Sequence, residues 1–209
     1  MAAGKQEVID WLSDLQRIYS ENRELLTALD SAIGDADHGI NMDRGFTAVK
    51  AELDTHPPVD LRSLFQTAAM VLIRTVGGAA GPLYGTFLLR ASAACGGKEV
   101  LGAGDAVAVF RAGVEGIQQR GKAEAGDKTM LDTFLPALSA MQEVLETGGD
   151  LRAVLEAGTA AAESGMLSTV PMQARKGRAS YLGARSVGHQ DPGATSACLM
   201  IRAAADHWA

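Results

Sequence analysis

The chain has few of the residues that stabilise secreted proteins or bind nucleic acids. Two cysteines, Cys95 and Cys198, are too few for a disulfide framework and lie in apolar helical surroundings, as expected in a reducing compartment. Lysine and arginine number 19 against 25 aspartates and glutamates, so the net charge of -6 argues against a nucleic-acid partner. No apolar signal segment is evident at the N-terminus. The longest uncharged stretch near the centre, residues 75–89, is too short and too rich in glycine to span a membrane. We therefore expect a cytoplasmic protein.

Alternating runs typical of β-strands are also lacking. Apolar residues instead recur at the i, i+3, i+4, i+7 spacing of a buried helix face, first over residues 8–19 and again over 61–73. Further helices are predicted over residues 38–53, 82–95, 104–120, 130–147, 150–165 and 192–207. About eight helices with short connections predict an all-α fold, an antiparallel up-and-down bundle or barrel, formed as a single domain over residues 1–209.

Four connections between these helices contain unusual residues, over 30–41, 77–81, 121–129 and 173–193. In an up-and-down array, alternate connections lie at the same end of the molecule. We therefore expect separate loops to converge on one site at one end of the bundle.

The first of these connections is acidic, with Asp30, Asp35 and Asp37 spaced around a glycine-containing turn. Carboxylate oxygens are ligands for Mg²⁺ or Ca²⁺. An EF-hand is excluded, because counting from Asp35 places Ile40 where the calcium loop needs glycine and Phe46 where it needs glutamate. The turn therefore predicts a site for magnesium bound to phosphate. The alternative is that Asp35 and Asp37 only cap the following helix.

The connection 77-GGAAGPLYGT-86 places glycines before Pro82 at a predicted helix start, where free backbone N–H groups and the helix dipole favour phosphate. It is neither a Walker A loop nor a dinucleotide fingerprint. Taken alone, GGAAG is a weak signal and is more typical of close helix packing at small residues.

The last connection, residues 173–193, is basic and long, and we call it the basic segment. It contains Arg175, Lys176, Arg178 and Arg185, which suit phosphate oxygens or an acidic partner. Asp191 followed by Pro192 is typical of a helix start. A solvated loop remains the alternative.

Five motifs together resemble a known family. They are Asp30 with 34-GDADHGINM-42, 77-GGAAGPL-83, 120-RGKAEAGDKTM-130, 172-MQARKGRASYLGARS-186 and 188-GHQDPGATS-196. In order and spacing, over nearly the whole chain, they resemble the ADP-binding L subunit of bacterial dihydroxyacetone kinase in its phosphotransferase-system-dependent form. The resemblance implies an eight-helix antiparallel barrel with ADP and magnesium bound at one end.

The resemblance also implies roles for individual residues. Magnesium, in one or two ions, would bind Asp30, Asp35 and Asp37. Arg178 would act in catalysis and also contact the nucleotide. The other nucleotide-binding residues would be His38, Asn41, Ala79, Ala80, Gly121, Met130, Asp191, Pro192 and Gly193. Ala80 departs from the family, where serine is common; a lost hydroxyl contact would cost about 0.5–1.5 kcal/mol.

In such a kinase, a phosphoryl group passes from a phosphohistidine donor subunit to bound ADP, and from the ATP so formed to dihydroxyacetone on a partner subunit. The resemblance further implies a possible homodimer. Two other functions stay open from the sequence. One is a nucleotide subunit of an ATP-dependent ketose kinase, and the other is a non-enzymatic sensor that binds a regulator in its ADP state.

Overall fold

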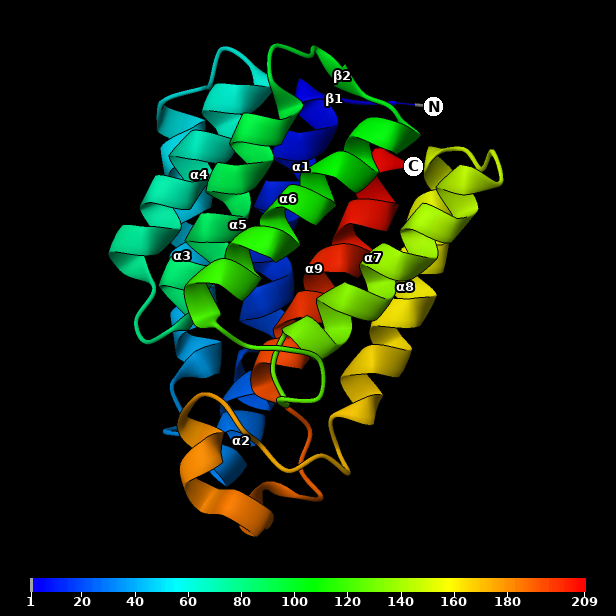
Figure 1. The fold of residues 1–209 in the computed structure, drawn as a ribbon. Coiled ribbons are helices and arrows are strands. Elements are labelled where there is room, and N and C mark those ends of the chain that lie inside the picture. The colour runs from blue at the N-terminus through cyan, green and yellow to red at the C-terminus, as the bar shows by residue number, and fades with distance from the viewer. Residues whose placement is uncertain (1) are drawn as a thin grey trace.

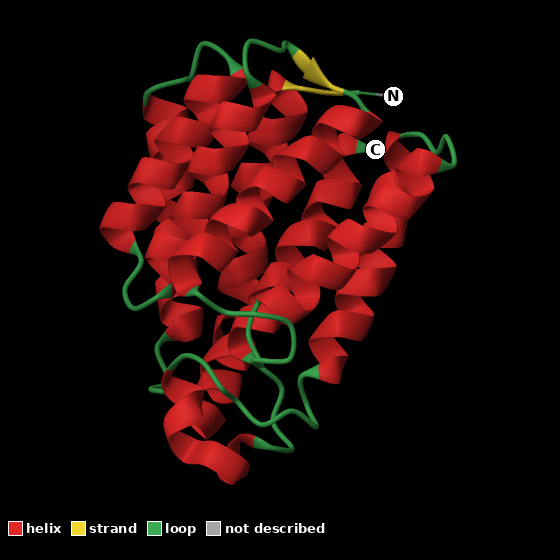
Figure 2. Cartoon of the chain, in the orientation of Figure 1, coloured by secondary structure: helices red, strands yellow, loops and turns green. Residues whose placement is uncertain are grey.

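Helices make up most of the protein in the computed structural model, which describes residues 2–209 (Figures 1 and 2). The predicted all-α fold class is confirmed. The elements of this part of the chain are β1 (Ala3–Gly4), α1 (Lys5–Glu21), α2 (Arg23–Ile33), α3 (His38–Thr55), α4 (Leu61–Thr75), α5 (Ala80–Cys95), β2 (Val100–Leu101), α6 (Ala103–Gly121), α7 (Leu131–Glu146), α8 (Leu151–Ser168), the 3-10 helix η1 (Arg178–Ser186) and α9 (Pro192–Trp208).

The predicted count of eight helices is approximate, because residues 2–209 form nine α-helices and one 3-10 helix. The additional α-helix is α2, which is separated from α1 by Asn22 alone and continues toward the same end of the molecule (Figure 1). The chain therefore still makes eight antiparallel passes. Two-residue strands β1 and β2 form one antiparallel pair, with Ala3 opposite Leu101.

Helix α9 closes the bundle, since it packs against α1 at one side and against α8 and α7 at the other. Its buried face is built largely from small residues, which allow close approach of neighbouring backbones. Trp208 near its end meets Trp11 of α1 edge-on, with ring centroids 5.0 Å apart. The Trp11 indole N–H donates to the carbonyl of Met200, 3.1 Å away. Burial of these two large rings fixes where α9 lies relative to α1.

The two termini lie at one end of the bundle, and the basic segment, drawn in orange, lies at the other (Figure 1). The connections α2–α3, α4–α5 and α6–α7 also point toward that second end, as the up-and-down pattern requires. None of the helices within residues 2–209 has both the length and the apolar character needed to cross a membrane.

Candidate functional site

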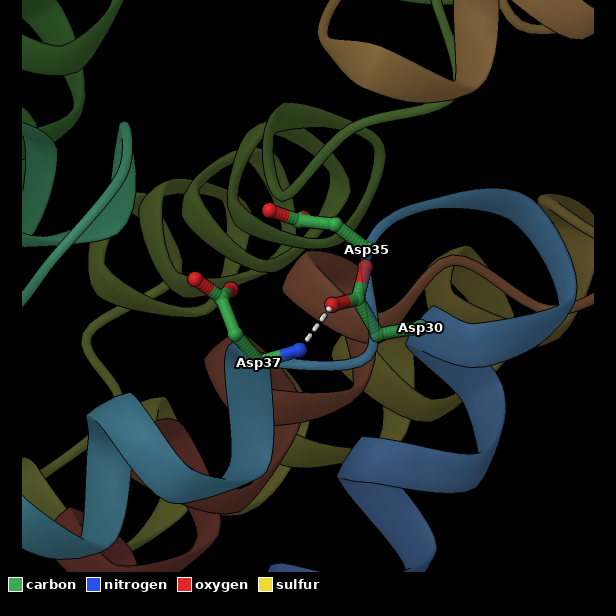
Figure 3. Close-up of side chains that lie close together, drawn as sticks. All are labelled: Asp30, Asp35 and Asp37. Atoms are coloured by element: carbon green, nitrogen blue, oxygen red, sulfur yellow. Dashed lines mark hydrogen bonds between the residues drawn. The ribbon is translucent and has the colours of Figure 1, made fainter.

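The acidic turn between α2 and α3 is organised by Asp30. One carboxylate oxygen of Asp30 accepts a hydrogen bond from the backbone N–H of Asp37 at 2.8 Å (Figure 3). The same oxygen accepts a second bond from the backbone N–H of His38 at 3.1 Å. Asp37 occupies the N-cap position of α3, yet its own side chain makes no capping bond. The helix is thus capped by a residue of the preceding helix, which leaves the Asp37 carboxylate available for another partner.

The three carboxylates are close enough to share a cation. Asp30, Asp35 and Asp37 each offer one oxygen, and these oxygens all lie within 4.8 Å of one another. Asp30 is buried, whereas Asp35 is exposed, and Figure 3 shows the Asp35 and Asp37 carboxylates on the same side of the turn. A side chain at Gly34 would collide with the Asp30 carboxylate. These hard oxygen donors fit magnesium, which binds few protein carboxylates and completes its shell with water or phosphate.

Arg178 of η1 contacts this turn, although the two are far apart in the sequence. Its guanidinium forms an ion pair with the Asp35 carboxylate at 3.1 Å. The side chains are 65% and 36% exposed, so the pair lies at the open side of the site. The arrangement places a positive group beside the acidic cluster, where phosphate oxygens bound to a metal would also need one.

The start of α5 offers backbone donors to the same region. The helix begins at Ala80, two residues earlier than predicted, and its N-cap residue Ala79 makes no side-chain capping bond. Gly78 has φ of +63°, a left-handed conformation that suits glycine. The first N–H groups of a helix have no partner within the helix. This end of α5 therefore has the donors and dipole that favour an anion.

His38 is positioned by a buried hydrogen-bond chain. Its Nε2 lies 2.9 Å from the hydroxyl of Ser196 in α9, and the Tyr84 hydroxyl of α5 lies 2.7 Å from the same Ser196 oxygen. Burial lowers the pKa of the His38 imidazole, against the opposing effect of the Asp30 and Asp37 charges. Burial thus favours the neutral form of the ring, which lines the site.

Asp191 caps α9 as predicted, and its carboxylate accepts from the N–H of Ala194 at 2.7 Å. Burial raises the pKa of Asp191 to about 7, partly opposed by that bond. The Asp191 N–H in turn donates to the hydroxyl of Thr169 at 3.0 Å. These bonds place the Asp191–Gly193 turn at the site wall.

All these features border one cavity of about 660 Å³, within the range of small-molecule sites. Every residue for which the sequence predicts a site role lines it, namely Asp30, Asp35, Asp37, His38, Asn41, Ala79, Ala80, Gly121, Met130, Arg178, Asp191, Pro192 and Gly193. The structure therefore brings the four connections together. The individual ligand roles of these residues stay predictions.

Two buried charged residues help to build this side of the site, Lys128 in the α6–α7 connection and Asp132 in the first turn of α7. Asp132 accepts from the N–H groups of Gly126 and, at 2.8 Å, Thr129, so it shapes the loop. Lys128 lines the cavity, yet only 1% of it is exposed. Burial lowers the pKa of the Lys128 ammonium, although the nearby Asp191 charge opposes this. Sequence reasoning missed Lys128, because its partners are main-chain carbonyls of distant residues. The three-residue spacing of Thr129 and Asp132, by contrast, is that of a helix cap.

Comparison with known proteins agrees with the fold and the motifs. The DAK2 domain family matches residues 32–206. The chain is 45% identical over 202 residues to the "PEP-dependent dihydroxyacetone kinase, ADP-binding subunit DhaL" of Escherichia coli (strain K12), which covers 97% of this chain and 96% of that protein. It is 43% identical over 203 residues, with the same coverage, to an ADP-binding subunit DhaL of a PEP-dependent dihydroxyacetone kinase from Listeria innocua.

A solved structure shares the fold. The dihydroxyacetone kinase from C. freundii, in complex with AMP-PNP and Mg²⁺, matches 99% of this chain and 34% of its own, with a TM-score of 0.74 and 23% identity. That likeness supports the helical architecture alone, whereas the two closer relatives confirm the resemblance carried by the motifs. The chain belongs to the DAK2 domain family.

Proposed function

We propose that this protein is the ADP-binding subunit of a dihydroxyacetone kinase and that its nucleotide acts as a retained phosphoryl carrier. The observation that carries the proposal is the convergence, on one cavity, of three carboxylates within 4.8 Å, an uncapped helix start and the Arg178 guanidinium. Relatives that are 45% and 43% identical bear the name ADP-binding subunit of a PEP-dependent dihydroxyacetone kinase.

The metal part of the proposal assigns Asp30, Asp35 and Asp37 as ligands of magnesium, with two ions as the finer hypothesis. When bound, magnesium would neutralise and orient the nucleotide phosphates. Asp30 is the ligand best fixed in advance, because two backbone N–H groups donate to one of its carboxylate oxygens. A preorganised ligand loses less conformational entropy when the cation binds.

The protein part of the mechanism needs no nucleophile, since phosphoryl transfer depends mainly on positioning and charge neutralisation. The N–H groups at the start of α5, near Ala79 and Ala80, would donate to phosphate oxygens. Arg178 would leave Asp35 to stabilise the charge on the transferred group, as its exposed position allows. His38, Asn41, Gly121, Met130 and the Asp191–Gly193 turn would bind the remainder of the nucleotide.

Two partners follow from this function. A phosphohistidine donor subunit would phosphorylate the bound ADP, and a dihydroxyacetone-binding subunit would receive the phosphoryl group from the resulting ATP. Both must reach the same phosphate. The exposed side of the cavity around Arg178 is the natural approach, since the buried side is closed by α9. Whether the chain also forms a homodimer is a separate hypothesis.

The nucleotide content of the purified protein tests this function. The protein would be prepared with Mg²⁺ throughout, dialysed at length, denatured in acid and assayed for ADP and ATP by chromatography. ADP close to one per chain after dialysis supports a retained carrier. A protein that binds ATP and exchanges it quickly would instead be a subunit of an ATP-dependent ketose kinase. Binding of a transcriptional or other regulator, with no transfer to a ketose, would indicate an ADP-state sensor.

A further inference from the structure

Lys128 is a buried lysine whose position the proposed chemistry does not explain. It lies in the α6–α7 connection with 1% of its surface exposed and with φ of 62°, a left-handed conformation that non-glycine residues adopt rarely. Burying an ammonium group is unfavourable unless its protons are hydrogen-bonded. The fold thus accepts both an uncommon backbone conformation and a buried charge at this position.

The partners of Lys128 account for its burial. Its Nζ donates to the carbonyl oxygens of Thr169 at 2.7 Å and Met172 at 3.1 Å, and also to that of His189. An ammonium group has three protons, so these three carbonyls use all of them. Although Lys128 borders the cavity, it has no proton left for a phosphate while these bonds are made.

These carbonyls mark both ends of the basic segment. Thr169 and Met172 lie just before it begins, whereas His189 lies near its end. The segment's two arms are also joined to each other, since the N–H of Gly188 donates to Val170 at 2.8 Å. Lys128 therefore joins both ends of the basic segment to the α6–α7 connection.

Few other contacts hold the basic segment in place. Its apolar contact is a small cluster of Ile33 in α2 with Ala174, Ala179 and Leu182, separate from the main core. Its other tie to the α6–α7 connection is a bond from the N–H of Arg175 to the carbonyl of Asp127, which precedes Lys128. Because this cluster buries little apolar surface, it contributes little to holding the segment against the bundle. The segment's other polar contacts include the exposed Arg178–Asp35 ion pair and the bond from the Asp191 N–H to Thr169. The bonds at residues 127 and 128 are therefore a substantial share of what holds it.

We propose that Lys128 is a positioning residue that clamps both ends of the basic segment and thereby keeps Arg178 beside the acidic turn. It acts through main-chain carbonyls and touches neither phosphate nor metal. The consequence for nucleotide retention rests on the proposed function, whereas the clamp itself does not.

Trypsin provides a direct assay, because the basic segment contains exposed cleavage sites at Arg175, Lys176 and Arg185. Cleavage of the nucleotide-free protein would be followed by mass spectrometry in the wild type, Lys128→Met and a control, Lys122→Met. Lys122 is the matched control, since it also has a left-handed backbone, with φ of 49°, in the same connection but is exposed. Methionine keeps an unbranched side chain that is one heavy atom shorter, and it removes the charge and the three donors.

In Lys128→Met we expect cleavage in the basic segment to be about tenfold faster or more, because hydrogen bonds to a charged group are among the stronger ones. Lys122→Met should match the wild type within about twofold, as expected for an exposed side chain. Unchanged cleavage in Lys128→Met, or an equal increase at trypsin sites throughout the chain, would overturn the proposal.

A second measurement covers the case in which Lys128→Met does not fold. In the wild type, a nitrogen-detected NMR experiment on lysine ammonium groups should show one slowly exchanging signal, and this signal should be absent in Lys128→Arg. Arginine keeps the charge, but its planar guanidinium cannot direct three donors to the same carbonyls. A spectrum in which Lys128 exchanges as fast as the exposed lysines would overturn the clamp.

Release of ADP then separates the clamp from the proposed function. With Mg²⁺ present, Lys128→Met should release ADP at least about tenfold faster than the wild type, matching the predicted increase in cleavage. ADP release at the wild-type rate from an opened segment would overturn the positioning role. Failure of the wild type itself to bind ADP would refute the proposed function, while the trypsin and NMR results would still decide the clamp.

Discussion

Asp30 and Asp35 are both proposed metal ligands, yet the structure predicts that removing Asp30 lowers the free energy of unfolding much more than removing Asp35. Asp30 is 8% exposed, and its carboxylate accepts two backbone N–H bonds at the start of α3. In Asp30→Ala these donors lose a charged acceptor. At roughly 1–2 kcal/mol for each unsatisfied donor, the free energy of unfolding should fall by about 2–4 kcal/mol.

Asp35 has only an exposed ion pair with Arg178. Such pairs contribute about 0–1 kcal/mol, and removing one of three neighbouring negative charges also relieves repulsion. Asp35→Ala should therefore unfold within about 1 kcal/mol of the wild type. Both variants should lose Mg²⁺-dependent ADP binding, because each lacks one proposed ligand.

The assay is urea unfolding without Mg²⁺ or nucleotide, followed by circular dichroism. Asp30→Asn serves as the control, since its amide oxygen still accepts from the two N–H groups while the negative charge is lost. It should recover much of the stability lost in Asp30→Ala. Equal destabilisation of Asp30→Ala and Asp35→Ala would refute the division of roles inferred from the hydrogen bonds.

Three further predictions concern other parts of the molecule. Arg178→Ala should slow phosphoryl transfer in a reconstituted system by about 10²-fold, as for loss of one charge-stabilising donor. The free energy of unfolding should change by less than about 1 kcal/mol. An unchanged transfer rate would exclude a catalytic role. Burial raises the pKa of Asp191 to about 7, so the protonated carboxyl stabilises the fold at pH 4 and this contribution is lost as the pH rises to 7. Over that range the free energy of unfolding of the wild type should fall by up to about 4 kcal/mol relative to that of Asp191→Asn. Parallel pH dependences of the two proteins in Mg²⁺-free urea unfolding would contradict this. A Cβ at Gly39 would collide with the Arg23 carbonyl and Thr27 of α2, whereas Gly97 faces open space. The free energy of unfolding should therefore fall by about 1–3 kcal/mol in Gly39→Ala and by much less in Gly97→Ala. Equal thermal stability of the two variants would show that α2 can move aside.

The helical fold could be predicted from the sequence because long helices bury one regular face. Helix α2 was not predicted in this way, because only Leu26, Asp30 and Ile33 of its 11 residues are buried and one of them is an aspartate. Its boundary with α1 is also a single residue, Asn22, without proline or glycine. Periodicity is a weak guide where a helix is short and its buried face is partly polar.

The site was predictable as a set of residue types but not as a set of hydrogen bonds. Aspartates in a turn and glycines before a helix mark cation and phosphate chemistry, whichever side chain makes each contact. The sequence could not show that Asp30, rather than Asp37, caps α3, because that depends on where α2 ends relative to α3. The partners of Lys128 are carbonyls more than 40 residues away, and carbonyls are present at every position.

Mg²⁺-dependent ADP binding in the wild type and Asp35→Ala, measured by isothermal titration calorimetry, tests the central claim most directly. The account predicts one ADP per wild-type chain, loss of that binding when Mg²⁺ is withheld, and loss in Asp35→Ala while its helical content is unchanged. Equal ADP affinity in the two proteins, or binding that ignores Mg²⁺, would show that the acidic turn does not hold the metal for the nucleotide.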